Sequence, residues 1–139
     1  DHAVRHGMTA LVCIGDTSEE YDAGRTAEAL ERQVLAAISK VEWAGGAKVV
    51  FAYEPVWSIG EGGTPASPEF ADEQHKRIKQ LTADKLGAPL TVLYGGSVNP
   101  GNCVDLTQCE HIDGLFIGRS AWKAEGYLSI IEDVTKALA

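Results

Sequence analysis

Four short runs of apolar, often β-branched residues recur along the chain and are separated by helical patterns. The runs cover residues 9–15, 47–53, 90–96 and 114–118. Each run is almost continuously hydrophobic and does not alternate, which is typical of strands in a parallel sheet that is covered on both faces. Because right-handed crossovers place such strands side by side, the pattern predicts an α/β fold of four β-α units with a parallel sheet.

Helix signals fill the intervals between these runs. Apolar residues at helical spacing predict helices from Thr26 to about Lys40 and from about Glu125 to Leu138. Ser67-Pro68-Glu69 predicts a helix start, with Ser as the N-cap and Pro at the first position, and Asn99-Pro100 is expected to open another helix in the same way. Residues 1–6 are expected to be the end of a helix, so the chain looks truncated.

The composition indicates one globular region over residues 1–139 and disfavours several kinds of partner. The net charge of −8 argues against nucleic acid, and there is no apolar run of the length that a membrane requires. The cysteines number three, without a C-x-x-C pair, which favours a reducing, cytoplasmic compartment. The histidines lack convincing metal-ligand spacing, so no metal is expected.

The motif that bears most on function is a carboxylate at the end of the second run. Glu54 directly precedes Pro55 and a glycine-rich loop. Proline ends a strand because it cannot donate to the ladder, and a buried charge is costly unless it has a partner or a role. The chemistry predicts that Glu54 is a general base beneath a mobile lid. The alternative is a solvated carboxylate in an ordinary surface loop.

Two later strand ends are suited to binding an anion. Residues 94–97 (Tyr-Gly-Gly-Ser) and 117–120 (Ile-Gly-Arg-Ser) each lead into a predicted helix. Backbone N–H groups in such loops, together with the helix dipole, can hold phosphate oxygens. Because ligands of parallel α/β folds bind at the carboxyl ends of strands, these loops are expected to lie near Glu54.

Together these motifs resemble the carboxyl-terminal half of a triosephosphate isomerase, over essentially the whole chain. The matching segments are residues 13–16, 23–26, 52–57, 59–60, 94–98 and 113–118. The resemblance implies strands 5–8 of a TIM (β/α)8 barrel, a half-barrel. It also implies an isomerase, without cofactor or metal, that interconverts dihydroxyacetone phosphate and glyceraldehyde 3-phosphate in glycolysis and gluconeogenesis.

The resemblance also assigns roles to individual residues. Glu54 is implied to be the base that moves a proton between two carbons of a small phosphorylated sugar. The implied lid has Pro55, Val56 and Trp57 as its first hinge, residues 58–62 with Ser58, Ile59 and Gly60 as its tip, and Tyr94 as a latch. The implied phosphate-binding residues are Gly60, Gly95, Gly96, Ser97 and Gly118. Asp16 is expected to be structural, and Cys13 is expected to be a buried packing residue.

Two positions depart from the family pattern. Arg119 stands where the family usually has a second glycine after Gly118. Its guanidinium could bind the phosphate or reshape the pocket, or it could point away and pair with an acidic neighbour. A changed phosphate loop also fits an alternative function, a tetrulose-phosphate isomerase of the same superfamily. At the far hinge, residues 63–65 are Gly-Thr-Pro, and Pro65 is expected to stiffen the lid.

A complete barrel needs roughly 250 residues, about twice this chain. The family's substrate-contacting Lys and carbonyl-polarising His lie in the other half, so the isolated chain is expected to lose most of its rate. The sheet is expected to have open edges and an uncovered inner face. We therefore expect the chain to pair with the missing amino-terminal half or to self-associate as a homodimer. A non-catalytic half-barrel that binds a phosphorylated metabolite remains an alternative.

Overall fold

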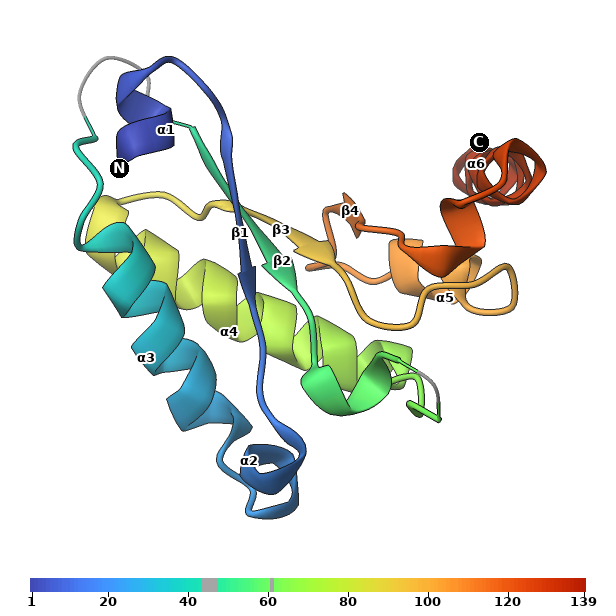
Figure 1. The fold of residues 1–139 in the computed structure, drawn as a ribbon, viewed down its shortest axis with the longest axis horizontal. Coiled ribbons are helices and arrows are strands. Elements are labelled where there is room, and N and C mark those ends of the chain that lie inside the picture. The colour runs from blue at the N-terminus through green and yellow to red at the C-terminus, as the bar shows by residue number, and fades with distance from the viewer. Residues whose placement is uncertain (44–47, 61) are drawn as a thin grey trace.

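The computed structural model describes residues 1–43, 48–60 and 62–139, and it confirms the predicted parallel sheet. The strands are β1 (Ala10–Ile14), β2 (Val49–Tyr53), β3 (Thr91–Tyr94) and β4 (Gly114–Leu115), and they lie side by side in chain order (Figure 1). All neighbouring pairs are parallel, with Phe51 of β2 opposite Val12 and Val92. Ala47, at the start of the second predicted run, lies outside the described residues.

Helices connect and flank these strands. They are α1 (His2–Arg5), α2 (Ser18–Asp22), α3 (Thr26–Ile38), α4 (Pro68–Leu86), α5 (Cys103–Thr107) and α6 (Ala124–Leu138), with 3₁₀ turns η1 (Val56–Ser58) and η2 (Arg119–Ala121). Within the described residues, every helix is too short or too polar to cross a lipid bilayer. The start of α4 is as predicted, because the Ser67 hydroxyl accepts from the Phe70 N–H and Pro68 occupies the first turn.

Two local features differ from the sequence-based expectation. Helix α2 was not predicted, although Thr17 and Glu20 form a capping box whose spacing is visible in the sequence. The helix start expected at Asn99-Pro100 is wrong, because α5 begins at Cys103. The Asn99 side chain accepts from the Gly101 N–H at 2.8 Å, which closes a turn that competes with the helix.

Helices α3 and α4 cover one face of the sheet and bury the core there (Figure 1). Leu30, Val34 and Ile78 from these helices are fully buried in one cluster with Phe51 and Val92 from the strands. Because side chains alternate along a strand, the neighbouring positions point to the opposite face. The core is therefore one-sided, between the sheet and two helices.

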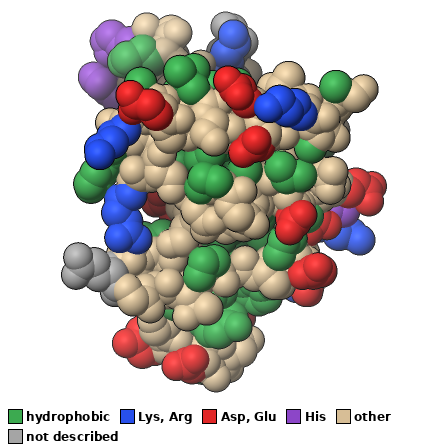
Figure 2. Space-filling model, turned by 90° about the vertical axis from the view of Figure 1, so that its right-hand side faces the viewer, with side chains coloured by type: hydrophobic (Ala, Val, Ile, Leu, Met, Phe, Trp, Pro, Cys, Tyr) green, Lys and Arg blue, Asp and Glu red, His purple; other side chains and the backbone are tan. Residues whose placement is uncertain are grey.

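The opposite face of the sheet is open. Leu11 is 42% exposed, and Cys13 on the same side of β1 is exposed. The expectation that Cys13 is buried is therefore wrong, because no described element covers this face. Hydrophobic side chains also reach the surface on the α6 side, among acidic ones (Figure 2). Exposed residues of α6 include Tyr127, Leu128, Ile131 and Leu138.

Candidate active site

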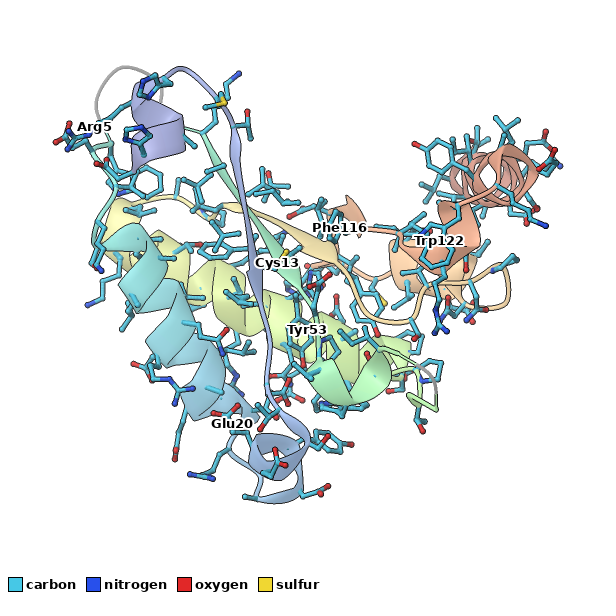
Figure 3. The ribbon with its side chains drawn as sticks, viewed as in Figure 1. Arg5, Cys13, Glu20, Tyr53, Phe116 and Trp122 are labelled. Carbon is cyan, nitrogen blue, oxygen red and sulfur yellow. The ribbon has the colours of Figure 1, made fainter. Side chains whose placement is uncertain are left out.

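An open pocket of about 700 Å³ lies at the carboxyl ends of β2, β3 and β4. The lining residues that the sequence predicted are Glu54, Ile59, Gly60, Gly95, Gly96, Ser97, Gly118 and Arg119. Ile117 and Ser120 line the pocket from the loop at 117–120, which was expected to bind an anion but in which only Gly118 and Arg119 were given roles. The lining residues that the sequence missed are Val98, Asn99, Phe116 and Trp122. Side chains alternate between the two faces along a strand, so Phe116 lies on the same face as Gly114, and this pattern could have indicated it as a lining residue. Figure 3 shows Phe116 and Trp122 on the β4 and η2 side of the molecule. The structure thus gathers the predicted base and the predicted phosphate loops around one pocket.

Backbone bonds to both neighbouring strands hold Glu54 in place. Its N–H donates to the Ile14 carbonyl at 2.7 Å, and the Gly95 N–H donates to the Tyr53 carbonyl at 2.7 Å. A Cβ on Gly95 would lie 2.6 Å from Glu54 Cγ, and one on Gly15 would lie 1.8 Å from the Glu54 carbonyl oxygen. The two glycines therefore make room for Glu54. The sequence predicted Gly95 only as a phosphate ligand and gave no role to Gly15.

Cys13 is the titratable neighbour of Glu54 on the open face. Partial desolvation and, after it, the Glu54 carboxylate raise the pKa of the Cys13 thiol. A thiol that keeps its proton is a poor nucleophile. The raised pKa disfavours a nucleophilic role for Cys13, even though the residue is exposed.

Asp16 anchors the first hinge of the predicted lid from the end of β1. Its fully buried carboxylate accepts from the hydroxyls of Thr26 at 2.6 Å and Tyr53 at 3.0 Å, and from the Trp57 indole N–H at 3.2 Å. Burial and then the Asp16 charge raise the pKa of Tyr53 far above its ordinary value. The Trp57 ring also stacks on Tyr21, with 4.1 Å between centroids. These contacts agree with the structural role expected for Asp16.

The predicted lid, residues 55–65, is described except for Glu61, which the sequence placed in its tip. Ser58 is fully buried and acts as an anchor, not as part of an exposed tip. Its hydroxyl donates to the Pro55 carbonyl at 2.9 Å, and its carbonyl accepts from the Ser97 hydroxyl. The Ser97 hydroxyl, expected to bind phosphate, contacts the lid in this structure. Ile59 and Gly60 are exposed.

Tyr94 lies beneath the start of the lid, where a latch was expected. Its side chain is fully buried, and burial raises the pKa of its hydroxyl. A Cβ on Gly96 would lie 2.2 Å from the Tyr94 hydroxyl oxygen and 2.8 Å from Ser58 Oγ. The absence of a Cβ at Gly96 therefore leaves room for the Tyr94 hydroxyl and the Ser58 side chain to approach each other, where the end of β3 meets the lid.

Arg119 faces the pocket and the lid. Its Nη2 donates to the Gly60 carbonyl at 2.8 Å, and the residue lines the pocket. The sequence left open whether the Arg119 side chain points toward the pocket or away from it to an acidic neighbour. In the structure it points toward the pocket. Among the described residues, Arg119 is the one Lys or Arg that lines it.

The family model described as Triosephosphate isomerase matches residues 1–134 of this chain. The chain belongs to the triosephosphate isomerase family. Together with the parallel four-stranded sheet, this membership confirms the predicted fold class, an α/β half-barrel from a TIM barrel. The chain's resemblance to that family, inferred from the motifs around Glu54 and Gly95, is likewise confirmed.

Curated relatives within the family have a more specific name, L-erythrulose-1-phosphate isomerase. The protein from Rhizobium etli is 53% identical over 137 residues, covering 98% of this chain and 51% of the relative. The protein from Brucella abortus is 54% identical over 130 residues, which cover 93% of this chain and 51% of the relative. The protein from Rhizobium meliloti is 49% identical over 137 residues, which cover 98% of this chain and 54% of the relative. The chain therefore spans about half the length of these relatives.

These relatives correct one expectation. The interconversion of dihydroxyacetone phosphate and glyceraldehyde 3-phosphate, with its place in glycolysis and gluconeogenesis, is wrong as the main functional prediction. The names agree instead with the alternative that Arg119 suggested, an isomerase of the same superfamily that acts on a tetrulose phosphate.

Proposed function

We propose that this chain is the base-carrying half of a tetrulose-phosphate isomerase. The observation that carries the proposal is 48–54% identity, over nearly the whole chain, to proteins named L-erythrulose-1-phosphate isomerase. The pocket supports it, because Glu54 lines the same cavity as the glycine loops at residues 95–96 and 118. A carboxylate base beside backbone donors suits a sugar phosphate.

The chemistry follows from the position of the carbonyl in such a substrate. In a tetrulose 1-phosphate, the carbonyl is at C2 and the phosphate is on C1. The proton on C3 is adjacent to the carbonyl, so the Glu54 carboxylate can remove it and leave an enediolate across C2 and C3. Returning that proton to C2, while the O3 proton moves to O2, places the carbonyl at C3. Only protons move, and the phosphate ester stays intact.

The substrate differs from dihydroxyacetone phosphate by one hydroxymethyl group on the carbon that loses the proton. The pocket must therefore accept that group close to Glu54. The lining of Phe116, Ile117 and Trp122 lies on the β4 side of the same pocket. Of these, Ile117 and Trp122 flank the residues expected to bind the phosphate, so we expect Phe116 to bound the space for the additional carbon.

Co-expression with the amino-terminal half of the Rhizobium etli relative provides the test. We expect turnover of L-erythrulose 1-phosphate with a higher kcat/KM than for dihydroxyacetone phosphate. Glu54→Gln keeps the shape and removes the base, so kcat should fall about 10²- to 10⁴-fold. The chain is also assayed alone, where weaker turnover is expected because the electrophile implied by the resemblance is absent.

Three outcomes would contradict the proposal. Faster turnover of dihydroxyacetone phosphate would show that the substrate is wrong. Equal turnover by the wild type and Glu54→Gln would show that Glu54 is not the base. Phosphate binding without turnover of either sugar would favour the non-catalytic half-barrel.

A further inference from the structure

Arg119 joins two loops that come from different β-α units. It belongs to η2, immediately after Gly118, and its Nη2 donates at 2.8 Å to the carbonyl of Gly60, which is 59 residues away in the sequence. The Ser97–Ser58 hydrogen bond joins the base of the lid to β3. The Arg119–Gly60 hydrogen bond joins the exposed part of the lid to the loop after β4.

The charges around the pocket suit the Arg119 side chain to a second contact, with an anion. Among the described lining residues, only Glu54 and Arg119 carry a charge. A phosphate monoester carries between one and two negative charges at neutral pH, and the chain itself has a net charge of −8. A guanidinium has five N–H donors in a planar fork. One of them binds Gly60, which leaves others beside Gly118 for an anion.

We propose that Arg119 is a positioning residue that holds Gly60 over the pocket and binds the substrate phosphate with its remaining N–H groups. Lid position and phosphate binding are then coupled through one side chain. The phosphate contact rests on the proposed function, whereas the lid contact does not. A glycine at residue 119 has no side-chain donor and can make neither contact.

The lid contact is tested on the 139-residue chain without ligand. Amide hydrogen exchange is measured at Ile59, whose N–H donates to the Val56 carbonyl, in the wild type, Arg119→Gly and Arg119→Lys. Loss of one hydrogen bond from a charged donor should speed exchange at this amide about five- to tenfold in Arg119→Gly and leave exchange in α3 unchanged. Lys136→Gln is the matched control, because it removes one positive charge from an exposed site on α6.

The phosphate contact is tested with inorganic phosphate as the probe. We expect the wild type to bind it with slower exchange in the lid, and Arg119→Gly to bind at least about tenfold more weakly. Arg119→Lys should recover part of the affinity but less of the lid protection, because an ammonium lacks the planar fork. In the co-expressed complex, Arg119→Gly should raise the KM for L-erythrulose 1-phosphate more than it lowers kcat.

The outcomes separate this proposal from the proposed function. Unchanged lid exchange in Arg119→Gly would overturn the positioning role, whatever the enzyme turns over. Unchanged phosphate affinity in that variant, or no phosphate binding by the wild type, would overturn the phosphate contact. Failure to isomerise the tetrulose phosphate, with the exchange result intact, would overturn the proposed substrate and leave the lid contact standing.

Discussion

His75 is expected to make the protein less stable as the pH falls below neutral. Its ring is fully buried on α4, 6.0 Å from the Tyr53 ring and 6.1 Å from the Tyr94 ring by centroid. Neither ring nitrogen has a hydrogen-bond partner among the described residues. Burial lowers the pKa of His75 from 6.5 to about 4, and the nearby Asp113 and Asp72 only partly oppose this effect.

The sign and the size of the effect follow from linkage. The unfolded chain protonates His75 near pH 6.5, whereas the folded protein resists protonation down to about pH 4. The contribution of neutral His75 to stability is therefore complete above pH 6.5 and is lost as the pH falls toward 4. At about 1.4 kcal/mol per pKa unit, the loss is about 2 kcal/mol at about pH 5 and about 3 kcal/mol at about pH 4.

Urea unfolding, followed by tryptophan fluorescence at a series of pH values, measures this loss. His75→Phe keeps an aromatic ring beside Tyr53 and removes the titration, so its stability should fall less than that of the wild type. The difference between the two proteins isolates His75 from the carboxylates that titrate in the same range. The exposed His2 gives a control, because His2→Asn should follow the wild type. Parallel pH curves for the wild type and His75→Phe would refute the reasoning.

Further predictions concern the residues around Glu54. Gly15→Ala should destabilise the chain by about 3 kcal/mol or more, because its Cβ would lie 1.8 Å from the Glu54 carbonyl oxygen, and the urea midpoint measures this. Gly95→Ala should displace the flexible Glu54 side chain, which lies 2.6 Å from the new Cβ at Cγ. It should lower kcat of the co-expressed complex about 100-fold with a much smaller change in urea midpoint, and an unchanged kcat would contradict the geometry. Asp16→Ala should cost about 3 kcal/mol or more by leaving buried hydroxyls unpaired, and thermal unfolding checks this. The same variant should increase hydrogen exchange at Trp57, which loses its indole partner.

Local signals predicted much of this fold. Continuous apolar runs located four parallel strands, although the described helices cover only one face of the sheet and Leu11 and Cys13 are exposed on the other. Ser67-Pro68 located the start of α4, because capping depends on a few adjacent residues. The same kind of signal failed at Asn99-Pro100, where a side-chain turn competes with the helix.

The sequence by itself determined the four-stranded parallel order, the place of Glu54 at a strand end and the glycine loops that meet it. Only the tertiary structure decided that Cys13 is exposed, that Ser58 is a buried anchor and that Arg119 reaches Gly60. The physical reason is distance along the chain. Strand and cap preferences are set by neighbouring residues, whereas exposure and side-chain pairing depend on segments tens of residues away that the fold brings together.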